Sequence, residues 1–422
     1  MSPGLTLLAR HVLPMAAPPI ENGWIRIERG RIAALGRRDP PGRPIDLGDA
    51  ILLPGLVNAH THLEFSDLKA PLSAEGGLPG WIGRIVAMRR ARAGGAEEQA
   101  RLLQAVEAGL GESAAAGVTT VGDIATTAYP AAVPVDGPRI RVFREALGLS
   151  SSSAGRHGLG RDLDRLAAAG LSVGISPHAP YSVAASLGRF LLTEARRRRL
   201  PVAMHLAESR EEAELLAAGT GAFRRLLDGL GVWDAATPPH LLPLADWISR
   251  LACAPRGIVV HGTFLPEDPA ALARLSRHRD RLCVVVCPRT ARTLSGTLPP
   301  VDAFRAAGVR VAIGTDGRGS SPDLSVLAEC RAAVAGGLAS PSEALVMATR
   351  HAAWALMQER RAGMLAPGRP ADIVILRPPA RPRDAHEAAM DPATQVVATL
   401  RGGRLIAGAI PEAAESAKTR GA

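Results

Sequence analysis

The sequence predicts a (β/α)₈ barrel joined to a small composite β-sandwich domain, which the N- and C-terminal segments form together. Three observations favour this fold. Eight short apolar runs alternate with helical stretches rich in alanine, leucine and arginine, a pattern typical of a parallel sheet. Both ends of the chain instead alternate apolar and polar residues around glycine turns. A length of 422 residues also accommodates the ~250 residues of a typical barrel and a second, smaller domain.

The two ends of the chain carry the strand patterns of the small domain. The stretch 23–36 alternates on both sides of Gly30, which predicts a β-hairpin. Strand patterns return at 371–376 and at 396–408, and the second of these predicts a further hairpin around its Gly-Gly pair. We expect the two ends to pack together, and we expect the last stretch, 411–422, to be a frayed tail. The predicted segments are 1–56 and 364–422 for the small domain and 57–363 for the barrel.

The eight apolar runs of the middle segment are the predicted barrel strands. Eight parallel strands with helices between them is the number that closes a barrel of this kind. The runs are 57–62, 118–123, 140–146, 171–180, 201–209, 257–262, 282–288 and 309–317. Because the interval between the fifth and sixth runs is long, we expect residues 219–256 to form an inserted helix and loop beside the strand ends.

Composition and charge exclude several classes of protein. The apolar fraction of 47% is ordinary for a globular chain, and its apolar runs fall far short of the ~20 residues that cross a bilayer. The first 18 residues lack a basic segment ahead of a long apolar stretch, so we expect a cytoplasmic location and no membrane partner. The net charge of +10 comes from arginines scattered along the chain, which gives no reason to expect a nucleic-acid partner. The four cysteines form neither a C-x-x-C pair nor a disulfide framework.

Four histidines and one carboxylate lie at the ends of four predicted strands. They are His60, His62, His205, His261 and Asp316. Barrel enzymes place reacting groups at this face because side chains from several strands converge there. Alternation along a strand points His60 and His62 the same way, so that both imidazoles can bind one metal ion. Each residue alone has an ordinary explanation, such as a hydrogen-bonded histidine or an aspartate that caps a helix. Their joint placement predicts a metal site.

Seven segments of the chain resemble signature segments of the amidohydrolase superfamily. They are PGLVNAHTHLE, SPHAPYS, MHLAES, VVHGTFL, VVVCPRT, VAIGTDGRGSSPDLSVL and GMLAPGRPADIVIL. Within the superfamily they are similar to the branch that holds cytosine, guanine, S-adenosylhomocysteine and aminodeoxyfutalosine deaminases. The resemblance implies one divalent metal ion bound by His60, His62, His205 and Asp316. This mixed set of nitrogen and oxygen ligands suits Zn²⁺ or Fe²⁺, and the sequence does not choose between them.

The resemblance also implies a reaction, hydrolytic deamination by hydroxide generated at the metal. Asp316 would accept the proton that the water loses, and His261 would stabilise the attacking oxygen. Glu208 would deliver a proton to the ring nitrogen and the leaving amine. The structural alternative for Glu208 is to cap the helix that begins at this point. Glu64 is a candidate to brace a ligand histidine, since metal-bound imidazoles usually donate their second N–H to a carboxylate or carbonyl.

The expected partner is a small-molecule substrate, most simply an aminopurine nucleoside such as aminodeoxyfutalosine or S-adenosylhomocysteine. Trp81, Arg144 and His178 are candidate contacts to its sugar and tail. The neighbouring candidates are Arg84, Glu145 and Tyr181, and ordinary packing is the alternative for Trp81 and Tyr181. Departures from the family pattern at Thr290, Ala291 and Gly317 leave the exact substrate open.

Three alternatives stay open from the sequence. The same mononuclear site could hydrolyse a cyclic amide or an aryl halide. A barrel of this kind could also be a non-enzymatic structural module, although such relatives usually lose metal ligands. The oligomeric state is not determined, and a homodimer is one of its options.

Overall fold

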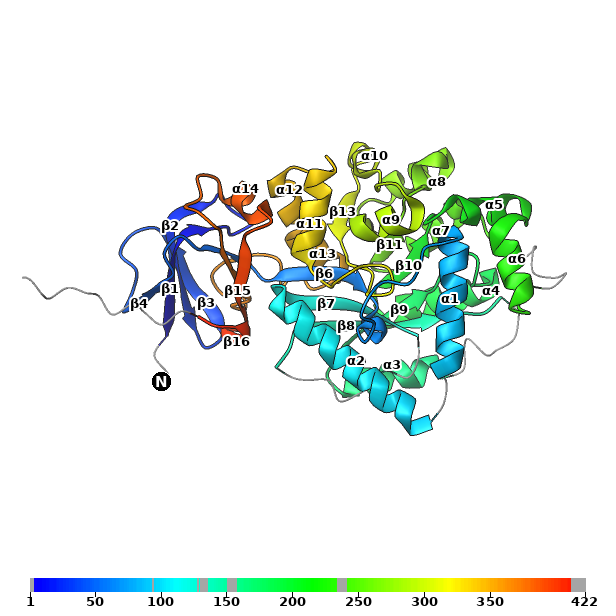
Figure 1. Ribbon diagram of the computed structural model, residues 1–422, viewed down its shortest axis with the longest axis horizontal. Helices are drawn as coiled ribbons and strands as arrows, with labels where there is room; N and C mark the ends of the chain where they lie inside the picture. The colour runs from blue at the N-terminus through cyan, green and yellow to red at the C-terminus, as the bar shows by residue number, and fades with distance from the viewer. Residues whose placement is uncertain are drawn as a thin grey trace, which may run out of the picture.

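The structure is a computed structural model, and it describes residues 4–92, 95–126, 129, 136–149, 158–233 and 241–410. Two sheets organise it: a small sheet at one end of the long axis and a barrel at the other (Figure 1). The barrel sheet has the strand order β13-β12-β11-β10-β9-β8-β7-β6. All of its neighbouring strands pair in parallel. The predicted tail, 411–422, lies outside the described residues.

The barrel strands coincide with the eight predicted runs. They are β6 Leu56–Thr61, β7 Val118–Ala125, β8 Arg139–Ala146, β9 Ser172–Pro177, β10 Val202–Leu206, β11 Gly257–His261, β12 Leu282–Val286 and β13 Arg310–Ile313. Most of the predicted runs continue past the carboxyl end of the strand. The extra residues form loops at this end, and several of these loops carry the polar side chains of the candidate site.

Backbone hydrogen bonds close the barrel between its first and last strands. The N–H groups of Thr315 and Asp316 both donate to the carbonyl oxygen of His60, at 3.0 and 3.1 Å. Gly314 permits this approach, because a Cβ at its position would lie 2.8 Å from that oxygen and 2.9 Å from the Cβ of His60. The closure therefore holds His60 and Asp316 side by side.

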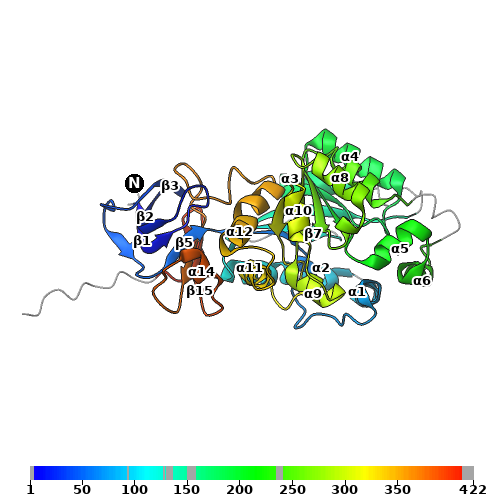
Figure 2. The same ribbon diagram turned by 90° about the horizontal axis from the view of Figure 1, so that it is seen from above.

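Helices surround the barrel in both views (Figures 1 and 2). They are α1 Gly77–Arg92, α2 Gly95–Ala115, α3 Leu159–Ala168, α4 Ala185–Arg198, α5 Arg210–Ala218, α6 Gly221–Gly229, α7 Leu244–Leu251, α8 Pro269–Arg277, α9 Pro288–Ser295, α10 Val301–Ala306, α11 Val326–Ala335, α12 Pro341–Val346 and α13 Ala352–Ala355. Helix α14 Ala385–Met390 lies beside the small sheet and contacts α11 and α12. Within the described ranges, none of them combines the length and apolar character needed to cross a bilayer.

The predicted insertion at 219–256 contains two helices with different roles. Helix α6 is the added element and packs against α1 at the mouth of the barrel. Helix α7 belongs to the barrel's helical layer, because the ring of Trp247 packs over Gly188 of α4. Residues 234–240, between these helices, lie outside the described residues.

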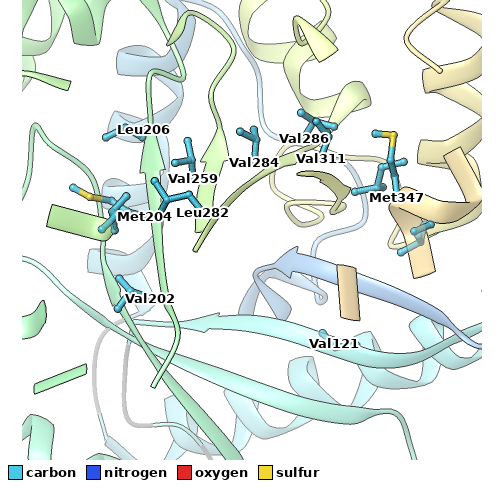
Figure 3. Packing of buried hydrophobic residues seen from close by; sticks show 14 of the residues in the cluster. Val121, Val202, Met204, Leu206, Val259, Leu282, Val284, Val286, Val311 and Met347 are labelled. Carbon is cyan, nitrogen blue, oxygen red and sulfur yellow. The ribbon is translucent and has the colours of Figure 1, made fainter. Parts of the chain in front are cut away.

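Alternation along the strands separates an outer core from the barrel interior. Val202, Met204 and Leu206 of β10 face the helices in the apolar cluster of Figure 3. Ala203 belongs to a separate apolar cluster inside the barrel. Because successive side chains of a strand point to opposite faces, His205 also faces the interior.

The small sheet joins the two ends of the chain. Its strand order is β16-β15-β14-β5-β1-β2-β3, with β4 paired to β1. The strands are β1 Leu5–Val12, β2 Ile20–Glu28, β3 Arg31–Gly36, β4 Pro44–Asp46, β5 Ile51–Pro54, β14 Ile373–Arg377, β15 Gln395–Arg401 and β16 Arg404–Gly408. Antiparallel pairing of β14 with β5 confirms that the ends pack together. Both predicted hairpins are present, and the turn residues Arg29, Gly30, Gly402 and Gly403 all have the positive φ of a type I′ turn.

Candidate functional site

Three imidazoles and one carboxylate converge at the carboxyl end of the barrel. His60 and His62 come from the end of β6, His205 from β10, and Asp316 from the loop after β13. One nitrogen or oxygen atom from each of the four lies within 4.8 Å of the others. Each residue is at most 9% exposed. The structure therefore brings together all four residues that the sequence selects as metal ligands.

The protonation states of these side chains fit a cation at their centre. Burial, followed by the charge of His60, lowers the pKa values of His62 and His205 well below their ordinary range. Burial alone would raise the pKa of Asp316, but a hydrogen bond from His60 and the neighbouring histidine charges hold it below its ordinary value. Neutral imidazoles and an ionised carboxylate are the forms in which these residues bind metals.

The geometry of the donor atoms leads to the same conclusion. Nε2 of His60 lies 3.2 Å from Oδ1 of Asp316, and Nε2 of His62 lies 3.3 Å from Nε2 of His205. Nδ1 of His205 lies 3.0 Å from the backbone oxygen of His178, so Nδ1 carries the proton and Nε2 presents its lone pair to the centre. Three nitrogens and one oxygen are a donor set that zinc and ferrous iron accept.

Glu64 does not brace a ligand histidine, and that hypothesis is wrong. Its carboxylate pairs with Arg89 of α1 and accepts a hydrogen bond from Oγ1 of Thr126 at 3.2 Å. The Nδ1 atoms of His60 and His62 have no hydrogen-bond partner among the described residues. The reason is local, because the short helix that follows His62 carries Glu64 toward α1.

Two hydroxyl groups support the Asp316 carboxylate. Oγ of Ser320 donates to Oδ2 of Asp316, and Oγ1 of Thr290 lies 3.0 Å from Oγ of Ser320. Both hydroxyl-bearing residues are 1% exposed. Thr290, which departs from the family pattern, thus belongs to a series of hydrogen bonds that ends on the candidate ligand Asp316. The glycine at position 317, the other departure, has a steric explanation. A Cβ there would lie 3.1 Å from the backbone oxygen of His62.

Glu208 and His261 lie beside the four ligands. Nε2 of His261 is 3.5 Å from Oε1 of Glu208, and their side chains are 2% and 11% exposed. Burial, with added effects from the charges of Asp316 and Glu212, raises the pKa of Glu208 well above its ordinary value. Burial likewise lowers the pKa of His261 to about 4. A carboxyl group that favours its protonated form next to a neutral imidazole suits proton delivery.

Glu208 does not cap the helix that follows it. The N-cap of α5 is Ser209, whose Oγ accepts a hydrogen bond from the N–H of Glu212 at 3.3 Å. Glu208 precedes the cap and faces the site. The spacing of Ser209 and Glu212 is the sequence signature of a helix start, and it could have identified both residues in advance.

Three non-glycine residues at the strand ends have left-handed backbones. Their φ values are 52° for Ala207, 66° for His261 and 61° for Asp316. Such conformations cost ~1–3 kcal/mol each and persist only where the surrounding structure holds them. All three belong to or adjoin the site, so the barrel concentrates backbone strain where it gathers the polar side chains.

A second polar group adjoins the ligands through His205. Ligand atoms of Glu145, His178 and His205 lie within 4.8 Å of one another. Oε2 of Glu145 accepts a hydrogen bond from Thr126 at 2.7 Å, whereas its buried Oε1 has no partner in the described parts of the chain. Burial and then the charge of Arg89 lower the pKa of His178 to about 3, and its Nδ1 lies 2.6 Å from Oγ of Ser182. Glu145 therefore offers an open acceptor beside the candidate metal site.

Arg144 is bound by protein groups. It pairs with Asp162 at 3.0 Å and donates to the backbone oxygens of Thr126 and Glu145, at 2.7 Å each. Contact between Arg144 and a substrate stays a prediction, and Glu145 is the better placed of the two neighbours.

The two aromatic candidates also have partners within the protein. The indole N–H of Trp81 donates to the backbone oxygen of Gly319 at 2.9 Å, which ties α1 to the loop after β13. Tyr181 stacks on Phe223 with ring centroids 4.2 Å apart and is 3% exposed, which favours the packing alternative for Tyr181. Contact between Trp81 and a substrate stays a prediction.

Comparisons with known proteins agree with this fold and with the family resemblance. The profile of the Amidohydrolase family matches residues 51–406. A 5-methylthioadenosine/S-adenosylhomocysteine deaminase from Moorella thermoacetica is 28% identical over 393 residues, covering 86% of this chain and 83% of the relative. An aminodeoxyfutalosine deaminase from Deinococcus radiodurans is 30% identical over 339 residues, covering 73% and 74%. The solved structure of Helicobacter pylori aminofutalosine deaminase with methylthio-coformycin has a TM-score of 0.81 and 23% identity, and covers 95% of this chain and 99% of its own. The predicted fold and family resemblance are confirmed.

Removing the hydroxyl that supports Asp316 should weaken metal binding. We expect Ser320→Ala to raise the dissociation constant for zinc by ~10- to 100-fold, because an unsupported carboxylate is less well oriented. Competition with a chromophoric chelator measures this change. Thr293→Val, on the exposed side of α9, is the matched control and should bind zinc as the wild type does. Equal affinities for Ser320→Ala and the control would show that the hydroxyl does not support the ligand.

Proposed function

The chain belongs to the amidohydrolase family, and on that premise we propose that it hydrolytically deaminates an aminopurine nucleoside at one divalent metal ion. The observation that carries this proposal is the joint placement of four buried ligands with Glu208 and His261 beside them. Retention of all these groups argues against the non-enzymatic alternative. Zinc is the metal that we propose, with ferrous iron as the alternative that the same donor set accepts.

Each residue has a separate task in the proposed reaction. A divalent ion bound by the four ligands would lower the pKa of a water molecule to about 7 and so supply hydroxide at neutral pH. Asp316 accepts the proton that the water gives up. Glu208 would deliver its proton to the ring nitrogen, and the proton held by Asp316 would pass to the leaving amine, which departs as ammonia. The second proton of the water would then restore Glu208. His261, as a neutral imidazole, donates an N–H to the oxygen that adds to the ring carbon.

The substrate that we propose is a nucleoside substituted at its 5′ carbon. One relative, at 28% identity, is a 5-methylthioadenosine/S-adenosylhomocysteine deaminase, and another, at 30% identity, is an aminodeoxyfutalosine deaminase. The open Oε1 of Glu145, on β8, and the ring of His178, after β9, lie beside His205, where they can bind polar groups of such a substrate. We also propose that Trp81 and Arg144, at the same end of the barrel, contact the substrate.

The ligands and the acid should respond differently to substitution. His60→Ala, His62→Ala, His205→Ala and Asp316→Ala each remove one donor, so we expect loss of both metal and activity. Glu208→Gln removes only proton transfer, so it should keep the metal and lose ~10²-fold or more in kcat. Elemental analysis of the purified variants, beside ammonia release, separates the two outcomes. Full metal content in any two ligand variants would refute the ligand assignment.

A substrate screen tests the reaction itself. Ammonia release should be measured with the metal-loaded enzyme on adenine, guanine, cytosine, adenosine, S-adenosylhomocysteine, methylthioadenosine and aminodeoxyfutalosine. We expect a 5′-substituted nucleoside to give the highest kcat/KM, by up to ~10⁴-fold over a free base, since buried groups built for a sugar are otherwise unpaired. A free base with the highest value would refute sugar recognition. Opening of a cyclic amide, or halide release, without deamination would favour the alternative hydrolysis.

A further inference from the structure

We propose that Glu212 is a positioning residue that fixes the backbone turn bearing Glu208, and thereby sets where the acid delivers its proton. This inference rests on the proposed function, in which Glu208 is the acid. Glu212 lies in the first turn of α5, is fully buried, and is separated from the metal ligand His205 only by that turn.

Both oxygens of the Glu212 carboxylate bind the turn. Oε1 accepts the backbone N–H of Ala207 at 3.1 Å, and Oε2 accepts the backbone N–H of Glu208 at 3.0 Å. In an ordinary capping box the carboxylate would instead bind the N–H of the N-cap residue, here Ser209. Glu212 reaches past the cap to the acid itself and to the residue before it.

The turn needs this support. Ala207 has a left-handed φ of 52°, a conformation that persists only where neighbouring groups hold it. Its backbone oxygen accepts the N–H of Phe264 at 2.8 Å, which attaches the turn to the loop after β11. Without the Glu212 carboxylate, the N–H groups of Ala207 and Glu208 would lose their acceptors in a buried place. The 3.5 Å approach of Glu208 to His261 therefore depends on Glu212.

The chain supplies a direct comparison in helix α12. Ser340 and Glu343 form an ordinary capping box, in which Oε2 of Glu343 accepts the N–H of Ser340 at 2.8 Å. That box is on the surface and lies in a helix that carries none of the site residues. Glu343→Gln is therefore the matched control, because it makes the same chemical change to a capping glutamate outside the site, whose other partner is Arg305 at 3.4 Å.

The test combines kinetics with hydrogen exchange. In Glu212→Gln one turn N–H faces an amide NH₂ group instead of an oxygen, so we expect a ~10- to 100-fold lower kcat from misplacement of the acid. Metal content should be unchanged and KM should change much less than kcat. Hydrogen–deuterium exchange in a peptide covering 205–209 should accelerate in the metal-loaded protein without substrate. Glu343→Gln should leave all four quantities at their wild-type values.

A second variant separates positioning from capping. Ser209→Ala removes the cap of α5 but leaves both Glu212 oxygens on the turn, so its kcat should stay within about threefold of the wild type. Should Glu212→Gln fail to fold, Glu212→Asp, which keeps the charge but shortens the reach, should show the same losses. Unchanged exchange at 205–209 in a folded Glu212 variant, or an equal kcat loss in Ser209→Ala, would overturn the inference. If exchange is faster in the Glu212 variant but the wild-type protein deaminates none of the substrates, Glu212 still supports the turn. That result would refute the proposed function and not the role of Glu212 in the turn.

Discussion

The ionised carboxylate of Asp316, buried among three imidazoles, makes the contacts on which the rest of the site depends. Its backbone N–H closes the barrel onto His60, and its side chain lies in the candidate ligand set. A buried charge is costly unless charged or hydrogen-bonding groups compensate it. The hydroxyl of Ser320 provides part of that compensation, and a cation bound between Nε2 of His60 and the carboxylate would provide the rest.

Two carboxyl groups in one site are driven to opposite protonation states by their surroundings. Asp316 has histidine partners that keep its pKa low, whereas Glu208 is buried near the charges of Asp316 and Glu212, which raise its pKa. One group can then accept a proton while the other donates one at the same pH. The fold produces this difference by placing Glu208 on a turn after β10 and Asp316 in the loop after β13.

The features of the fold that depend on local periodicity could be predicted from the sequence. Apolar runs located the eight strands, and the strand ends together with the family resemblance located His60, His62, His205 and Asp316. Contacts between segments that are distant in the sequence could not be predicted from periodicity. The pairing of Glu64 with Arg89 depends on how α1 packs, and the engagement of Arg144 with Asp162 depends on α3. The support that Ser320 and Thr290 give to Asp316 joins α9 to the loop after β13, which no spacing in the sequence reveals.

A crystal structure of the zinc-loaded enzyme, with anomalous data collected on both sides of the zinc edge, tests the central claim most directly. We expect one strong peak, with nitrogens of His60, His62 and His205 and an oxygen of Asp316 at ~2.0–2.2 Å. We expect no peak between Glu145 and His178, which we assign to substrate. A principal peak at Glu145 and His178, or no peak among the four ligands in fully loaded protein, would refute the ligand assignment.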